Sequence, residues 1–272
     1  MPFTPSHAVV ALPFVRTPLV PAAIAIGAMT PDLPLFVRGT PLQYGRTHDL
    51  AWLPVTVLVA LALLVVWRCI LRPAVRELAP RWLAARLPGE WDAGARASWR
   101  ETFPPRASAL LLLVASLAIG VVSHIVWDLF THEARWGVEL FPLLDADWGP
   151  LTGYKWLQHG SSVVGLAVIG VWMLVWLARR APVTPRTRVV PDIVRWVWWF
   201  SLPVILIVAW FALLPLYGGF DEHFGPAHLA YRVLPPACAL WGALTVVLCL
   251  VVQARRRAAT TDAANAAESR GS

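Results

Sequence analysis

The sequence has little charge. Only 14% of its 272 residues are Asp, Glu, Lys or Arg, whereas 58% are hydrophobic, and the mean hydropathy is +0.61. A soluble domain carries about 25% charged residues, so this composition excludes an ordinary soluble globular protein. It predicts an all-α fold, a polytopic helical bundle embedded in a membrane.

Cysteine and the familiar short catalytic motifs are also scarce. The three cysteines, Cys69, Cys238 and Cys249, lie in or beside apolar runs, and no CxxC occurs. We therefore interpret them as small apolar residues, which excludes a disulfide framework and a zinc knuckle. No GxSxG, HExxH, phosphate-binding glycine loop or Rossmann pattern is present. A signal peptide is not expected, because Arg16 and neighbouring prolines interrupt the first apolar run.

Long apolar runs take up most of the chain. Five are long enough to cross a bilayer as helices, with predicted bounds 50–67, 107–131, 161–178, 193–216 and 233–252. Many of the 16 Trp lie at the ends of these runs, as in an interfacial belt. We expect one membrane-embedded helical domain over residues 1–256 and a disordered cytoplasmic tail over residues 257–272.

The net charge of +7 is unevenly distributed. Arg concentrates in segments 68–106, 179–192 and the tail, whereas 133–160 and 217–232 are acidic. With five spans the basic segments fall on one side, so the positive-inside rule places them, and the C-terminus, in the cytoplasm. This favours a multi-pass protein of the bacterial plasma membrane and explains the basic charge without a nucleic-acid partner. The basic loop 68–106 lies on anionic headgroups or is a solvated loop that fixes topology.

Residues 1–47 contain two apolar runs that are too short to span a bilayer. The first opens at His7, and the second, Leu19 to Met29, ends just before Asp32. A hairpin of two short helices would place His7 and Asp32 at the same end. One proline-broken span over residues 9–31 would instead place them on opposite sides of the membrane. We expect the hairpin, entering from the extracytoplasmic side.

The segment SHIVWDLFTH places three ionisable residues inside the second predicted span. His124, Asp128 and His132 are spaced i, i+4, i+8. At 100° per residue they lie within about 80° of one helix face and rise roughly 12 Å along it. Ionisable groups in a membrane helix are costly, so they usually face a partner, a cavity or a metal.

The predicted topology brings further ligand-type residues to the same extracytoplasmic end. The candidate set is His7, Asp32, His48, His124, Asp128 and His132. Four imidazoles and two carboxylates suffice for one or two divalent ions, with zinc expected, and Asp128 is placed to bridge two ions. Such ions clamp an oxyanion and activate water. Next to Gln158 at the start of the third span, His159 is a further candidate ligand.

Two other interpretations remain open for this row. His124 and Asp128 could form a hydrogen-bonded pair that ties helices together, in a non-catalytic membrane protein whose polar row is structural or binds an ion. A proton or ion pathway would need ionisable groups deep in the other spans. The third, fourth and fifth spans are nearly free of them, which weakens that interpretation.

Several motifs resemble a known family. MPFTPSHAVVALP, LVPAAIAIGAMTPDLP, RTHDL, SHIVWDLFTH and LQHGSSVVG resemble the bacterial membrane family called domain of unknown function 4184. The resemblance covers most of the chain to about residue 178, and the remainder more loosely. That family is similar to the inner-membrane metal-dependent hydrolases of bacteria and, more distantly, to zinc-dependent phospholipase C.

The resemblance implies a zinc cluster whose ligands are the six residues of the candidate set. The sequence departs from the phospholipase pattern in lacking its HxxxE pair on a later helix, for which His159 is the nearest candidate. Sequence and resemblance together predict a metal-dependent hydrolase of an ester or phosphoester in a lipid-like substrate. Membrane lipids are the expected partners, because a site at headgroup depth is reached from the bilayer.

Overall fold

The computed structural model describes residues 4–184 and 187–271. Among them are five helical segments long and apolar enough to cross a membrane: Leu50–Leu78, Ala107–Thr131, Gly153–Ala178, Asp192–Tyr217 and Pro226–Asp262. The described residues contain only one two-stranded hairpin, β1 (Asp147–Trp148) with β2 (Leu151–Thr152). The predicted polytopic helical fold is therefore confirmed.

The chain groups into two compact units, where the sequence predicted one domain over residues 1–256. The first unit comprises Met1–Pro34, Gly39–Val65 and Phe103–Arg179, and the second comprises Leu35–Arg38, Val66–Thr102 and Arg180–Ser272. The first contains η1 (Thr4–Phe14), α1 (Pro21–Met29), η2 (Thr30–Asp32), α3 (Tyr44–Thr47), η3 (Leu50–Trp52), α4 (Leu53–Val65), α8 (Ala107–Thr131), α9 (Trp136–Leu140), α10 (Pro142–Asp145), β1, β2 and α11 (Gly153–Ala178). Helix α2 (Leu33–Phe36) leads from one unit to the other.

The N-terminal segment is a helical hairpin. The 3-10 helix η1 and the α-helix α1 pack against each other and are joined by residues 15–20. The hydroxyl of Thr4 donates to Asp32 Oδ2 at 2.6 Å, so the start of η1 and the end of η2, the turn that follows α1, lie at the same end of the hairpin. This confirms the hairpin over a single broken span.

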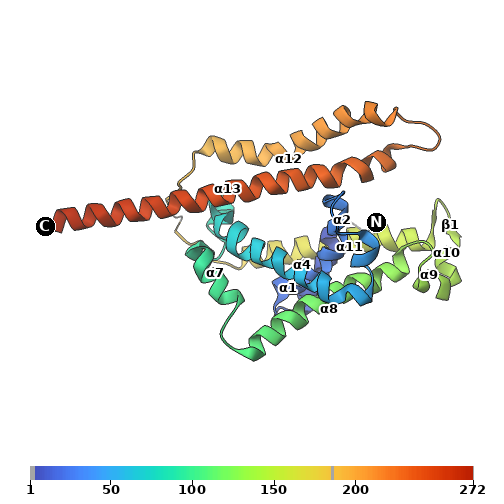
Figure 1. Cartoon of the computed structure of the whole chain (residues 1–272), viewed down its shortest axis with the longest axis horizontal. Helices are drawn as coiled ribbons and strands as arrows, with labels where there is room; N and C mark the ends of the chain where they lie inside the picture. Colours follow the sequence, from blue (N-terminus) through green and yellow to red (C-terminus); the bar gives the residue numbers. More distant parts are fainter. Residues whose placement is uncertain (1–3, 185–186, 272) are drawn as a thin grey trace. The chain divides into compact units, whose positions relative to one another are not determined.

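A glycine crossing docks the hairpin on the second span. Helix α1 packs against α8 (Figure 1). Gly27 of α1 faces Gly120 of α8 at the crossing. A Cβ at Gly120 would lie 2.2 Å from the carbonyl oxygen of Ile24, and one at Gly27 would lie 2.4 Å from that of Leu117. The two backbones can approach this closely only because neither position carries a side chain. At the start of α1, the Val20 N–H donates to Ser116 Oγ at 2.9 Å.

The third span is longer than hydropathy predicts. Helix α11 begins at Gly153, eight residues before the predicted start at Ser161. Tyr154 and Gln158 are buried in its first two turns, and Lys155 is exposed. Because these turns mix polar and apolar residues, a search for apolar runs does not detect them.

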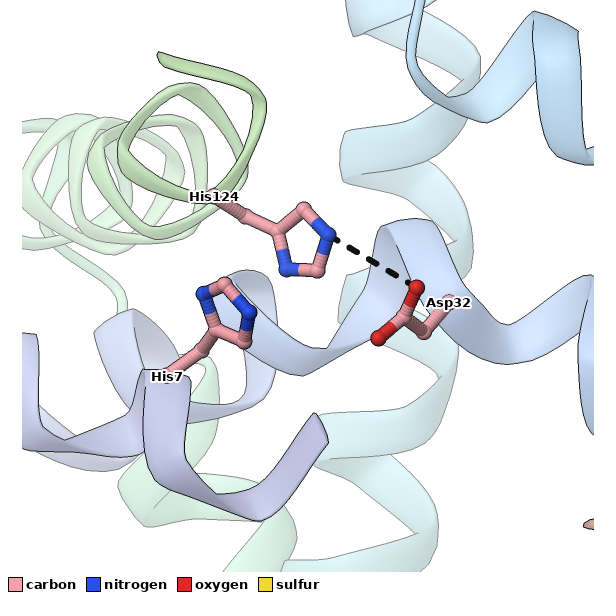
Figure 2. A group of neighbouring side chains, drawn as sticks. All are labelled: His7, Asp32 and His124. Atoms are coloured by element: carbon pink, nitrogen blue, oxygen red, sulfur yellow. Dashed lines mark ion pairs between the residues drawn. The ribbon is translucent and has the colours of Figure 1, made fainter. Parts of the chain in front are cut away.

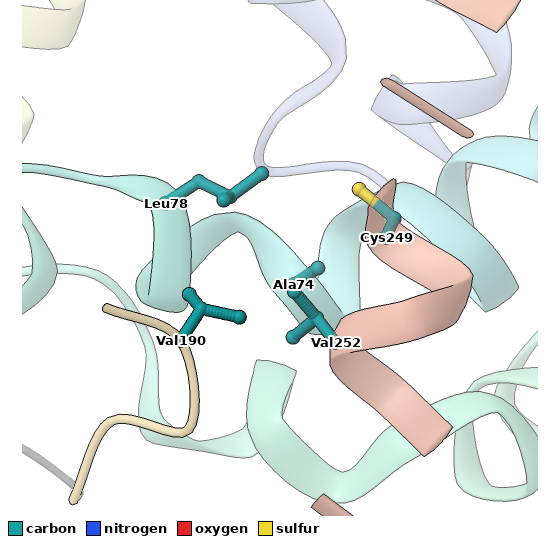
Figure 3. Packing of buried hydrophobic residues seen from close by; sticks show 5 residues of the cluster. All are labelled: Ala74, Leu78, Val190, Cys249 and Val252. Atoms are coloured by element: carbon teal, nitrogen blue, oxygen red, sulfur yellow. The ribbon is translucent and has the colours of Figure 1, made fainter. Parts of the chain in front are cut away.

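The second unit contains η4 (Val66–Leu71), η5 (Arg72–Ala74), α5 (Val75–Leu78), α6 (Arg81–Ala84), η6 (Gly89–Ala93), α7 (Gly94–Thr102), α12 (Asp192–Leu213), η7 (Leu214–Tyr217) and α13 (Pro226–Gly271). Helices α12 and α13 lie side by side (Figure 1). Trp198 stacks on Trp241 with 5.3 Å between ring centroids, and Trp198 donates to Thr245 Oγ1 at 3.0 Å. Figure 3 shows the core of this unit, formed by Ala74, Leu78, Val190, Cys249 and Val252.

Residues 68–106 are not a loop throughout, in contrast to the prediction. The first span continues as a helix to Leu78, and short helices occupy much of the remainder. Arg72 and Arg76 are buried because acids from the same stretch neutralise them. Arg72 Nη1 donates to Glu101 at 3.0 Å, and Arg76 Nη1 donates to Asp92 at 2.6 Å. The cytoplasmic location of this segment stays a prediction.

The last helix continues into the predicted tail. Helix α13 extends to Gly271, and residues 257–262 are exposed along it. The Ala-rich composition of this segment favours a helix. That the tail is disordered and cytoplasmic in the cell stays a prediction.

The glycine crossing gives a first test. Gly120→Ala should lower the stability of the protein by about 1–3 kcal/mol, because the added Cβ forces α1 away from α8. Gly170→Ala on α11 is the matched control, since a Cβ there meets nothing within 4 Å. Thermal unfolding in detergent should show a lower Tm for Gly120→Ala alone. Equal melting temperatures for the two variants would contradict the crossing.

Candidate metal centre

The six predicted ligands come together in the first unit. His7 lies on η1, Asp32 ends η2, and His48 follows α3 just before the first span. The other three lie on the last two turns of α8 or directly after it. The hydroxyl of Thr47 donates to the Pro31 carbonyl at 2.7 Å, which holds the segment carrying His48 beside Asp32.

Asp128 lies among all four imidazoles. Its carboxylate oxygens are 3.4 Å from His48 Nε2, 3.5 Å from His124 Nε2, 3.5 Å from His132 Nδ1 and 3.9 Å from His7 Nε2. The i, i+4 spacing on α8 produces two of these contacts, and the hairpin and the segment before α4 supply the others. The fold therefore brings Asp128 within reach of all four imidazoles, and its role as a bridge between two ions stays a prediction.

Backbone carbonyls fix the orientation of two rings. Nδ1 of His124 lies 2.7 Å from the Ala28 carbonyl oxygen, and Nδ1 of His48 lies 2.9 Å from that of Tyr44. A carbonyl can only accept, so each Nδ1 carries the proton and each neutral ring has a bare Nε2. This carbonyl-to-imidazole contact is the usual support of a metal-binding histidine.

The two bare nitrogens face each other. His48 Nε2 and His124 Nε2 are 3.2 Å apart in a buried setting. Two lone pairs at this distance repel unless a proton or a cation lies between them. With Asp128 Oδ2 they form a triangle with sides of 3.2, 3.4 and 3.5 Å. Ligands on a tetrahedral ion with bonds near 2.05 Å are separated by about 3.3 Å, so the triangle fits one face of a zinc site.

A second group lies beside the first. Figure 2 shows the side chains of His7, Asp32 and His124 converging from three segments. Asp32 Oδ1 lies 3.7 Å from His124 Nε2 and 3.9 Å from His48 Nε2. The groups His7, Asp32, His124 and His48, His124, Asp128 each offer ligand atoms within 4.8 Å of one another, and they share His124.

Three buried atoms of the cluster lack hydrogen bonds. His7 Nε2, Asp32 Oδ1 and Asp128 Oδ1 have no hydrogen-bond partner among the described residues. Each such atom costs about 1–3 kcal/mol when it is left unpaired. A divalent cation would satisfy all three, so the donor set of this cluster fits a metal.

Burial also sets the protonation of the hairpin residues. Removal from water, together with the nearby His124, lowers the pKa of His7 to about 3, so the ring is neutral at neutral pH and able to bind a metal. Burial raises the pKa of Asp32. This is the expected effect on a buried carboxylate that has no Arg or Lys beside it to supply a compensating charge. A bound cation would supply that charge.

The two remaining candidate ligands, His132 and His159, differ in their exposure. His132 caps α8, is partly exposed, and contacts Gln158 with 3.2 Å between the two Nε2 atoms. His159, the further candidate ligand, is exposed on α11, while the preceding Gln158 is buried and reaches the cluster. The helical turn that buries Gln158 directs the exposed His159 side chain to another face of α11, and its role as a further ligand stays a prediction.

An apolar pocket adjoins His7. Its volume is about 500 Å³, and its lining includes Ser6, His7, Ser123, Trp127 and Ser161 together with valines of η1, α8 and α11. The rest of the lining is apolar, and Val164 of this lining is 61% exposed. The pocket therefore suits an acyl chain better than a polar solute.

These features define a polytopic membrane protein with a buried His/Asp cluster whose side chains could hold a metal. The sequence matches the family described as Domain of unknown function (DUF4184) over residues 1–222, and the chain belongs to that family. No curated protein and no solved structure matches the chain.

Some supporting contacts were not predicted from the sequence. The carbonyls of Ala28 and Tyr44 and the hydroxyl of Thr4 bind cluster residues, yet nothing in their residue types marks them. A motif search finds side chains that carry chemistry. Carbonyls that orient them become visible only when the chain is folded.

A disulfide tests whether η1 reaches the site. A Cβ at Gly165 of α11 would lie 3.2 Å from Ser6 Cβ, next to His7 and close to the range that a disulfide needs. In a background without Cys69, Cys238 and Cys249, Ser6→Cys with Gly165→Cys should cross-link on mild oxidation. Ser6→Cys with Gly170→Cys should not, because position 170 lies more than one turn further along α11 on another face. Cross-linking of both pairs alike, or of neither, would contradict the docking of η1.

Proposed function

We propose that this protein is a metal-dependent hydrolase of the bacterial plasma membrane that cleaves an ester or phosphoester in a lipid-like substrate. The observation that carries the proposal is the pair of Nε2 atoms of His48 and His124, held 3.2 Å apart by backbone carbonyls and completed by Asp128. This arrangement is unfavourable without a cation and favourable with one.

The residues divide into two ligand groups. His48, His124 and Asp128 would hold one divalent ion, for which zinc suits the imidazole and carboxylate donors best. His7 and Asp32 would hold a second, with Asp128 and His124 between the two groups and His132 at the exposed edge. Bound ions of this kind polarise an ester or phosphoryl oxygen and lower the pKa of a bound water.

The chain's own groups would position the substrate. The apolar pocket would take an acyl chain between η1, α8 and α11. His7 lines this pocket and also belongs to the cluster. The ester or phosphoester bond at the polar end of a bound acyl chain would therefore lie next to the ligand groups. The carbonyls of Ala28 and Tyr44 would keep the histidine rings in place during the reaction. We place the site at the extracytoplasmic face because the positive-inside rule, applied to the sequence, assigns the Arg-rich segments to the cytoplasm.

Hydrolysis of phospholipid analogues and acyl esters in mixed micelles tests the proposal. Wild type should hydrolyse at least one of these substrates, lose activity with a chelator and regain it with zinc. Asp128→Asn should lower the rate by about 100-fold or more, because it removes the charge of the carboxylate that lies among all four imidazoles. His159→Gln is the matched control and should keep full activity, since His159 is exposed on α11.

Metal content separates the two parts of the proposal. Wild type should retain one or two zinc ions per chain, and a His124→Ala, Asp128→Ala variant should retain none. If both hold the same substoichiometric metal, the metal centre is wrong. If metal binding follows the prediction but no substrate is hydrolysed, the cluster is an ion-binding tie between helices and the hydrolase proposal falls.

A further inference from the structure

The second unit carries more arginine than its acids can neutralise. Four acids each have an arginine partner, in the pairs Arg72–Glu101, Arg76–Asp92, Arg256–Glu77 and Arg195–Asp192. Among the arginines that lie near the start of α12, Arg81 and Arg188 are outside these four pairs. Arg188 comes only within 4.0 Å of Asp192, and the guanidinium of Arg81 makes no hydrogen bond or ion pair with the residues that the structure describes.

Both surplus arginines line one pocket. It has a volume of about 240 Å³, and its polar and aromatic lining consists of Arg81, Arg188, Asp192, Arg195, Trp196 and Trp199. By count of the lining residues, three guanidinium groups and one carboxylate give a net charge of +2. The buried Glu77 lies 3.9 Å from Arg195 Nη1 behind the lining, and Arg256 also pairs with it at 3.1 Å. A charge of this size gathered in a concave site attracts an anion.

The pocket is held rigidly from behind. Arg188 Nη2 donates to the Ala79 carbonyl at 2.8 Å, and Arg195 Nη1 donates to the Val190 carbonyl at 2.8 Å. Val190 and Leu78 belong to the core cluster of Figure 3, so these contacts rest on packed residues. Arg188 and Arg195 are thus fixed, while the exposed Arg81 can close on a ligand.

The position of the pocket points to a lipid. Asp192 begins α12, one of the five candidate spans, so the pocket lies at the end of a span. Trp196 and Trp199 are 59% and 44% exposed there, and Trp199 is fixed by a 3.0 Å hydrogen bond to the Leu78 carbonyl. Exposed Trp at a span end marks the headgroup level of a bilayer.

We infer that this pocket binds the phosphate of an anionic lipid headgroup. Guanidinium groups are the preferred partners of phosphate, since they donate paired hydrogen bonds to its oxygens. A free phosphate ion offers the same chemistry, but it gains nothing from the exposed Trp pair. All of the lining residues belong to the second unit, so the inference does not rest on the proposed hydrolase function.

Native mass spectrometry of the full chain tests the inference. Released from detergent, wild type should retain one phosphatidylglycerol at a level about tenfold above phosphatidylcholine, by the strength of charge-assisted hydrogen bonds. Arg81→Gln with Arg188→Gln should lower that retention about tenfold. Arg100→Gln with Arg106→Gln removes the same charge from exposed positions outside the pocket and should leave retention unchanged.

Two further variants guard against a folding effect. Arg81→Gln alone removes a side chain that makes no hydrogen bond with the described residues, so the fold is kept and retention should still fall. Asp192→Asn removes the one acid and should raise retention. Equal retention by wild type and Arg81→Gln would overturn the inference. If millimolar inorganic phosphate raises the Tm of wild type as much as phosphatidylglycerol does, the lipid assignment is wrong.

Discussion

The opposition of two imidazole nitrogens is the constraint on which the rest of the first unit depends. His48 Nε2 and His124 Nε2 are 3.2 Å apart because each ring is anchored through Nδ1 to a backbone carbonyl. One of those carbonyls, that of Ala28, belongs to α1. Its position relative to His124 depends on the close approach of α1 to α8 at Gly27 and Gly120. The glycine crossing and the geometry of the candidate site are therefore one feature of the fold.

The two units bury their acidic side chains in different ways. In the first unit the acids Asp32 and Asp128 lie among histidines, and three buried atoms lack hydrogen-bond partners among the described residues. In the second unit the acids Glu77 and Asp92 are neutralised by arginines and buried with them. Ion pairs between permanently charged groups suit a structural core. Carboxylates surrounded by titratable rings suit a site that receives a cation.

Much of the fold and the cluster could be predicted from the sequence. Hydropathy gives the five spans, because twenty apolar residues have few alternatives to crossing a bilayer. The spacing of His124, Asp128 and His132 gives their shared face, because helical geometry is fixed. The two short, proline-broken apolar runs within residues 1–47 predict the hairpin, and the hairpin brings His7 close to Asp32. The start of α11 and the helices within residues 68–106 could not be predicted, because buried Gln158, Arg72 and Arg76 depend on distant partners rather than on local composition.

X-ray absorption spectroscopy at the zinc edge, on protein purified with zinc, tests whether His48, His124 and Asp128 hold a metal. We expect zinc with nitrogen and oxygen ligands near 2.0–2.1 Å and outer-shell scattering from at least two imidazole rings, which His48→Gln should reduce. Zinc bound through sulfur, zinc without imidazole scattering, or a spectrum unchanged by His48→Gln would contradict this expectation.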